Sequence, residues 1–188
     1  MKNLIILSAP SGTGKTTLCK KIQKVFLDVE WSVSYTTRLI RKGEKNGKDY
    51  NFISLKLFND MIKNKYFVEW ENVHGELYGT IKKNIDFIIK QNKLLLLELD
   101  VKGALNVKKL YPDNTYSIFI IPPSISDLKK RLKNRNTESD KKIKIRLNRF
   151  KEEIKYKSNF DYIMINNNLE VAFEELVSII NKIRKGIK

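Results

Sequence analysis

The chain has 188 residues, 41% of them hydrophobic and 31% charged, which suits one domain with a sizeable core and excludes a disordered chain. Its net charge of +16 comes from 37 basic residues, and the 30 lysines among them are scattered, which favours a solvated surface over a specific nucleic-acid partner. No apolar run approaches the roughly 18 to 20 residues that cross a bilayer, and the single cysteine cannot form an internal disulfide, so we expect a cytoplasmic protein with no membrane partner.

The first predicted element is a buried strand at Leu4–Leu7, because four consecutive apolar residues precede a loop that contains glycine. From Lys15 to Phe26, the apolar residues Leu18, Ile22 and Val25 recur at helical spacing. A strand, a glycine loop and a helix in this order indicate the start of an α/β unit.

The loop at residues 9–16 reads A-x-x-x-x-G-K-T, the Walker A phosphate-binding pattern apart from its first position. Backbone N–H groups at the start of a helix attract an anion, and glycines let the backbone approach it closely. Lys15 is expected to reach the outer phosphates, and the Thr16 hydroxyl to hold Mg²⁺. Ala9 is tolerable in place of glycine if its φ angle is negative. The pattern predicts a triphosphate site formed by Ala9, Pro10, Ser11, Gly12, Thr13, Gly14, Lys15 and Thr16.

Between Ser32 and Thr80 the pattern changes. Short β-like pieces (WSVSYTT, YNFI and YFVEW) alternate with turn signals such as Asn46-Gly47 and the pair Gly75 and Gly79. This alternation predicts a small mixed insert on the core.

Further along the chain, apolar runs predict more buried strands at 94–99, 117–121 and 162–165, and a closing amphipathic helix at 169–185. Continuous apolar strands that alternate with helices indicate a parallel sheet covered on both faces. The predicted fold class is therefore α/β.

The segment 126–157 is predicted as two charged helices joined by the polar link NRNTESD. Arg131 and Arg135 are four residues apart and would share one helical face. Ser139 or Asp140 is expected to cap the second helix.

Four blocks are distinctive in order, spacing and residue type: SVSYTTRLIRKGEKNGKDYNFIS (32–54), FVEWENVHGELYGT (67–80), LLLELDVKGA (95–104) and the segment 118–147. Together they resemble the guanylate kinase family, and the resemblance runs from Leu4 to about Leu176. It implies transfer of the γ-phosphoryl group of ATP to GMP, with dGMP expected as a second acceptor and Mg²⁺ as cofactor. It also implies a P-loop parallel-sheet core at about 1–31, 81–125 and 158–188, a mixed α+β GMP-binding insert at about 32–80, and a helical lid at about 126–157.

By this resemblance, GMP is bound by Ser34, Arg38, Arg41, Tyr50, Glu69, Tyr78, Thr80 and Asp100. The planar fork of arginine can bond a phosphate bidentately, which lysine cannot. A carboxylate facing the N1–H and N2–H donors of guanine, with hydroxyls facing O6, would read the base. Adenine lacks these donors and would leave the buried carboxylate unpaired, at a cost of about 1–3 kcal/mol. Thr80 stands where serine is common in the family.

The resemblance also implies the residues that surround the transferred group. Phosphoryl transfer depends on positioning and on cancelling negative charge rather than on covalent chemistry by the protein. The implied catalytic residues are Lys15, Arg38, Arg131, Arg135 and Arg146. Asn166 is implied to contact adenine as a further ATP-binding residue, although the usual N-D-D of the family is NNN at 166–168 here.

Three other functions stay open at this point. The domain could be a non-enzymatic binding module, although such relatives tend to lose the phosphate loop. It could phosphorylate another monophosphate such as AMP or dTMP, against which Ser34, Glu69 and Thr80 argue. A charge-driven nucleic-acid binder would show a strongly salt-dependent affinity. The oligomeric state is not indicated.

Overall fold

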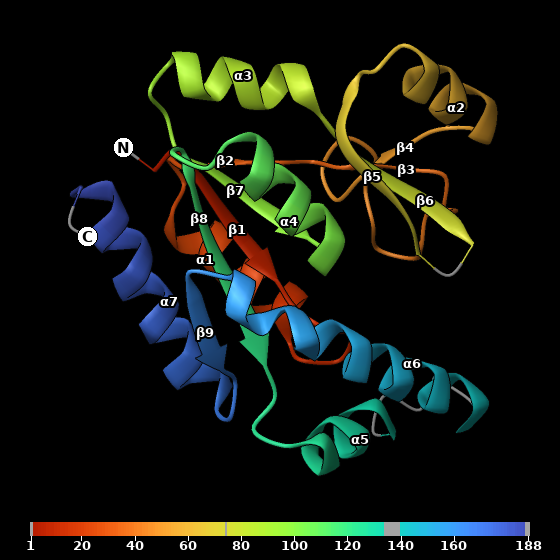
Figure 1. Cartoon of the computed structure of the whole chain (residues 1–188), viewed down its shortest axis with the longest axis vertical. Coiled ribbons are helices and arrows are strands. Elements are labelled where there is room, and N and C mark those ends of the chain that lie inside the picture. The colour runs from red at the N-terminus through yellow and green to blue at the C-terminus, as the bar shows by residue number, and fades with distance from the viewer. Residues whose placement is uncertain (1, 74, 134–139, 187–188) are drawn as a thin grey trace.

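The computed structural model describes residues 2–73, 75–133 and 140–186, and a five-stranded sheet forms its centre (Figure 1). Every neighbouring pair of strands in this sheet is parallel. In spatial order the strands are β2 (Glu30–Trp31), β7 (Leu95–Leu99), β1 (Leu4–Ser8), β8 (Thr115–Ile121) and β9 (Tyr162–Ile165). The predicted parallel core is confirmed.

One strand of this sheet, β2, was not predicted, because the piece WSVSYTT divides between two sheets. Trp31 pairs with Leu96 in the core, and the Ser32 backbone N–H still donates to the Leu96 carbonyl, at 2.9 Å. Two residues later, the Ser34 carbonyl accepts from the backbone of Asn51 in the second sheet, also at 2.9 Å. Ser34 therefore lies where the chain passes from one sheet to the other.

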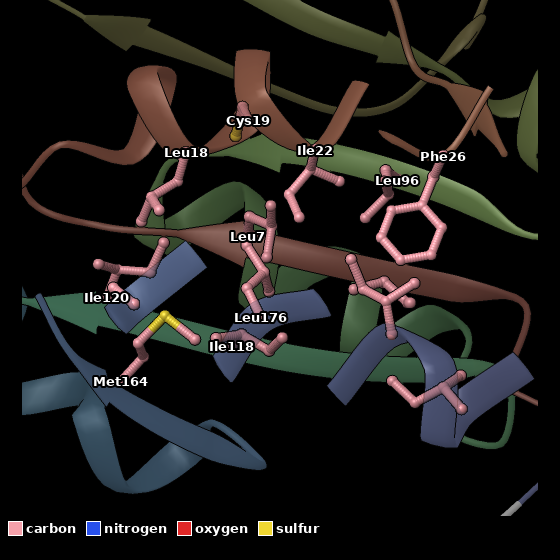
Figure 2. Packing of buried hydrophobic residues seen from close by; sticks show 14 of the residues in the cluster. Leu7, Leu18, Cys19, Ile22, Phe26, Leu96, Ile118, Ile120, Met164 and Leu176 are labelled. Atoms are coloured by element: carbon pink, nitrogen blue, oxygen red, sulfur yellow. The ribbon is translucent and has the colours of Figure 1, made fainter. Parts of the chain in front are cut away.

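Helices cover both faces of the core sheet. Because side chains alternate along a strand, Ile5 and Leu7 lie in one apolar cluster, while Leu4 and Ile6 lie in another. The first cluster includes side chains of α1 (Lys15–Val25) and α7 (Leu169–Arg184), and Figure 2 shows them packed around Leu7. The second includes side chains of α3 (Lys82–Lys90) and α4 (Val101–Leu110).

The second sheet lies beside the core (Figure 1). Its strands, in spatial order, are β4 (Asn51–Phe52), β3 (Tyr35–Thr36), β6 (Glu76–Ile81) and β5 (Phe67–Val73). β3 and β4 are parallel, whereas β6 is antiparallel to both of its neighbours. With α2 (Leu55–Lys63), this sheet confirms a small mixed unit on the parallel core, and we call it the second sheet unit.

The segment predicted as the lid contains α5 (Ile125–Lys133), α6 (Asp140–Glu153) and the 3₁₀ helix η1 (Ile154–Asn159). The two α-helices share a small apolar core formed by Leu128, Leu132, Ile143 and Phe150. Residues 134–139, which include most of the polar link, lie outside the described residues. None of the described helices is long and apolar enough to span a membrane. The division of the chain into core, insert and lid at the stated residues stays a prediction.

Removing buried apolar volume from the sheet should destabilise the fold more than the same change at its edge. Ile118 on β8 is 0% exposed, whereas Ile163 on the edge strand β9 is 41% exposed. Ile118→Ala is expected to lower the free energy of unfolding by about 2–5 kcal/mol, through lost transfer energy and a residual cavity. Ile163→Ala should cost less than about 1 kcal/mol. Urea denaturation measures both values, and equal losses would contradict this packing.

Candidate active site

The phosphate loop joins the end of β1 to the start of α1, and its glycines are required by conformation and space. Gly12 and Gly14 have φ angles of +91° and +93°, which side chains with a Cβ rarely adopt. A Cβ on Gly14 would also stand 2.5 Å from the amide nitrogen of Asn166. The φ angle of Ala9 is not positive, so the departure from glycine at that position brings no backbone strain.

Lys15 and Thr16 are held at the first turn of α1 by the end of strand β7. The Lys15 ammonium donates to the Leu99 carbonyl at 2.8 Å and lies 3.7 Å from the Glu98 carboxylate. The Thr16 hydroxyl donates to the same carboxylate at 2.8 Å. Parallel strands bring their carboxyl ends to one edge of the sheet, so Glu98 and the phosphate loop meet there.

Asn166 supports the loop from the side of β9. Its side-chain amide donates to the Thr13 carbonyl at 2.7 Å, and the residue is 3% exposed. Arg131 of α5 donates to the backbone carbonyls of Asn166 and Asn167, at 2.8 and 3.3 Å. This chain of contacts links the predicted lid to the phosphate loop. Contact of Asn166 with adenine stays a prediction.

The other arginines of the lid segment reach different parts of the core. Arg146 of α6 donates to the Ser11 hydroxyl in the phosphate loop. Arg135 lies outside the described residues. Arg149, which was not predicted, donates to Asp100, with 3.4 Å between nitrogen and oxygen. Its position three residues after Arg146, on the same side of a helix, is a signal that could have found it.

A cleft of about 220 Å³ lies where the phosphate loop faces the second sheet unit. Its lining combines the phosphate-loop lysine with five of the residues predicted to bind GMP. The predicted ATP-binding and GMP-binding residues therefore meet in this cleft. The lining residues are Lys15, Ser34, Tyr50, Glu69, Glu71, Val73, Tyr78, Glu98, Leu99 and Asp100.

Glu69 is the most buried carboxylate in the cleft, with 8% exposure. Burial raises its pKa to about 7, and the negative charges of Asp100 and Glu71 add to the rise. The nearby Thr80 hydroxyl lowers the pKa of Glu69 in part. This hydroxyl is itself buried, and it makes no hydrogen bond of normal geometry within the described residues. Gly103 of α4 allows this packing, since a Cβ there would stand 2.6 Å from a Glu69 oxygen.

Neither Arg38 nor Arg41 lines the cleft, but Arg38 contacts Tyr78, which does. Arg38 donates to both carboxylate oxygens of Glu44 at 2.9 and 3.0 Å, to the Tyr78 hydroxyl at 3.2 Å and to the Leu39 carbonyl at 2.7 Å. Four of its five N–H groups are therefore used. The Arg41 side chain is exposed, and its charge acts on the same Glu44 carboxylate, whose pKa it helps to lower.

Comparison with known proteins identifies the family. A sequence model described as guanylate kinase matches residues 1–183. The chain belongs to the guanylate kinase family. It is 42% identical to the guanylate kinase of Thermotoga maritima over 98% of this chain and 88% of that protein, and 44% identical to that of Geobacter metallireducens over 94% and 87%.

Solved structures agree with this assignment. The crystal structure of guanylate kinase from Anaplasma phagocytophilum matches with a TM-score of 0.78 at 30% identity, over 95% of this chain and 84% of that one. Dephospho-CoA kinase from Campylobacter jejuni matches with a TM-score of 0.54 at 18% identity, which shows a shared fold alone.

For this guanylate kinase family member, cleft volume alone does not identify the site. A larger cleft of about 650 Å³ lies between α1 and the loop at 43–49, with Trp31 and Leu96 on its wall. None of the residues predicted to bind ATP or GMP lines it. The smaller cleft is the candidate active site because both sets of family residues meet there.

The two arginines of the family motif should differ in their contribution to stability. Arg38→Gln removes the fork that pairs the Glu44 carboxylate and should lower the free energy of unfolding by about 1–3 kcal/mol. Arg41→Gln removes an exposed charge that is screened by solvent and should change the free energy of unfolding by less than about 0.5 kcal/mol. Urea denaturation at neutral pH makes the comparison. A loss of stability in the Arg41 variant as large as in the Arg38 variant would contradict these contacts.

Burial of Glu69 should make stability depend on pH. The carboxyl holds its proton more tightly in the folded chain, so its contribution is lost as the pH rises from about 4.5 to about 7. Glu69→Gln cannot ionise and should be more stable than the natural protein by about 3 kcal/mol near pH 8, and by less than about 1 kcal/mol near pH 5. Glu152→Gln, an exposed control on α6, should change little at either pH. A pH-independent difference between Glu69→Gln and the natural protein would rule out this account.

Proposed function

We propose that this protein transfers the γ-phosphoryl group of ATP to GMP and yields ADP and GDP. The observation that carries the proposal is the single cleft in which Lys15 of the phosphate loop faces Tyr50, Glu69 and Tyr78 of the second sheet unit. Transfer between two bound nucleotides requires such adjacency of two anion sites. The names of the relatives, guanylate kinases with high coverage of both chains, support the same reaction.

The base is read by Glu69, with Thr80, Ser34 and Asp100 beside it. Guanine offers N1–H and N2–H donors to a carboxylate and an O6 acceptor to a hydroxyl. The Thr80 hydroxyl is buried next to Glu69 and lacks a normal hydrogen bond within the described residues, which supports its assignment to the O6 side of the base. Adenine would leave Glu69 without donors, and sites of this kind discriminate by roughly 10⁴.

The phosphate of GMP is held by Arg38, Arg41, Tyr50 and Tyr78. Tyr78 and Arg38 already share a hydrogen bond at 3.2 Å, and the Arg38 guanidinium lies 5.3 Å from the centre of the Tyr50 ring. These contacts fix the direction of the Arg38 fork before a ligand arrives. The exposed Arg41 supplies a second fork for bidentate contact with the phosphate.

The ATP side consists of the phosphate loop, residues 9–16, and the lid arginines. Lys15 and the loop backbone bind the outer phosphates, and Arg131, Arg135 and Arg146 surround the transferred group. The residues also fit Mg²⁺, because Thr16 presents a hydroxyl oxygen at the loop and Glu98 holds that hydroxyl in place at 2.8 Å. Bound Mg²⁺ would neutralise negative charge on the phosphates. Within the described residues no cluster of three or more His, Cys, Asp or Glu side chains could hold a metal, so we assign Mg²⁺ to Thr16 and the nucleotide.

The remaining parts of the proposal concern acceptor range and partners. We include dGMP as a second acceptor, because no residue in the cleft is assigned to the ribose 2′ position. We place the protein in the cytoplasm, with no specific nucleic-acid or membrane partner. The intact Gly14, Lys15 and Thr16 favour an enzyme over a binding module.

A coupled assay for ADP release tests this function directly. With ATP and Mg²⁺, turnover is expected with GMP and dGMP, and rates lower by roughly 10⁴ with AMP, UMP and dTMP. Lys15→Met should abolish turnover while leaving the protein folded, because the outer phosphates lose their cation. Phosphorylation of AMP without phosphorylation of GMP would overturn the proposal.

A further inference from the structure

The candidate GMP cleft carries an unfavourable charge for its proposed ligand. Among its lining residues Lys15 is the only cation, whereas four are carboxylates: Glu69, Glu71, Glu98 and Asp100. The phosphate of GMP is negative, so uncompensated carboxylates would oppose its binding. How each carboxylate is compensated therefore affects the affinity of the cleft.

Three of these carboxylates have a cation from a different structural element. Glu98 is 3.7 Å from Lys15 of the phosphate loop, Glu71 is 3.5 Å from Lys102 of α4, and Asp100 is 3.4 Å from Arg149 of α6. Lys15 and Lys102 belong to the core and stay with the cleft. Arg149 belongs to the lid segment, so its charge reaches Asp100 only while α6 is docked.

The contact between Arg149 and Asp100 is held from both sides. Asp100 is the N-cap of α4, and its other oxygen accepts from the Gly103 backbone N–H at 2.8 Å. Arg149 also forms an ion pair with Glu153, one turn further along α6, at 2.5 Å. The side chains of Arg149 and Asp100 are 28% and 21% exposed, so solvent only partly screens the pair.

We propose that Arg149 is a positioning residue that couples docking of the lid to the affinity of the cleft for GMP. This inference rests on the proposed function. While α6 is docked, the positive charge of Arg149 offsets the negative charge of Asp100, and the part of the cleft around Glu69 and Asp100 can bind GMP. Because coupling between two sites is reciprocal, bound GMP stabilises the docked lid, and ATP held under the lid tightens GMP.

The same contact should affect Glu69. The charged groups that face Glu69 are Asp100, at the start of α4, and Glu71, on its own strand β5, while Thr80 of β6 contributes a hydroxyl. Asp100 raises the pKa of Glu69. Without Arg149 the Asp100 charge is uncompensated, so the pKa of Glu69 rises further and the carboxylate form needed for guanine requires a higher pH.

The experiment compares Arg149→Gln and Arg149→Lys with the natural protein and with the control Lys151→Gln, an exposed lysine on the same helix. Calorimetry measures the dissociation constant of GMP with and without a non-hydrolysable ATP analogue. We expect the analogue to tighten GMP binding by about fivefold or more in the natural protein and in the control. This factor should approach one in Arg149→Gln and recover in part in Arg149→Lys.

Two further measurements separate coupling from a merely structural role. Thermal melting should show that Arg149→Gln stays folded, and the midpoint of the pH profile of kcat/KM for GMP should move to higher pH in this variant alone. An unchanged coupling factor and pH midpoint in Arg149→Gln, with GMP still phosphorylated by the natural protein, would overturn this inference alone. Failure of the natural protein to phosphorylate GMP would overturn the proposed function and this inference with it.

Discussion

The parallel pairing of β1 with β7 sets the position of the charged groups at the candidate active site. Leu7 pairs with Glu98 and Ser8 with Leu99, so the strand that leads into the phosphate loop ends beside the strand that carries Glu98 and is followed by Asp100. Glu98 then contacts the phosphate loop, while Asp100, two residues later, caps α4 and lines the cleft. One strand end therefore serves both halves of the site, as the carboxyl edge of a parallel sheet allows.

The lid segment reaches this edge through guanidinium groups that contact three different places. Arg131 binds backbone carbonyls after β9, Arg146 binds the phosphate loop, and Arg149 binds Asp100. The apolar core of α5 and α6 meets the main sheet through Ile154 of η1, which packs against both this core and the cluster that contains Leu4 and Ile6. Partly solvated polar contacts are individually weak, so these three contacts hold the segment less firmly than the apolar clusters hold the helices on the main sheet.

Much of the fold was predictable because local signals agree with the tertiary arrangement. The runs at 4–7, 94–99 and 117–121 are almost entirely apolar because their strands are covered on both faces, whereas 162–165 belongs to the edge strand β9, in which only Met164 is buried. Strand β2 was missed because two residues, Glu30 and Trp31, are too short to show a period. The piece that follows them changes sheets, which no local pattern records.

The candidate active site likewise contains residues that could be predicted from the sequence and residues that could not. The residues of the phosphate loop could be predicted because their spacing is local and their chemistry is specific. Glu44 and Arg149 were not predicted, because their importance comes from partners that the fold supplies, namely Arg38 and Asp100. The elevated pKa of Glu69 depends on burial between strands and helix α4, which the sequence does not encode at any single position.

The pairing of Arg38 with Glu44 has a consequence for how anions enter the site. Four of the five Arg38 N–H groups already have acceptors, and two of these acceptors are the oxygens of one carboxylate. A phosphate that takes the Arg38 fork therefore replaces an internal anion and does not fill a bare cationic pocket. The Glu44 carboxylate holds the Arg38 guanidinium in an orientation suited to two parallel hydrogen bonds. The affinity for an incoming anion is therefore the difference between the free energy of its contact with Arg38 and that of the Glu44 contact it replaces.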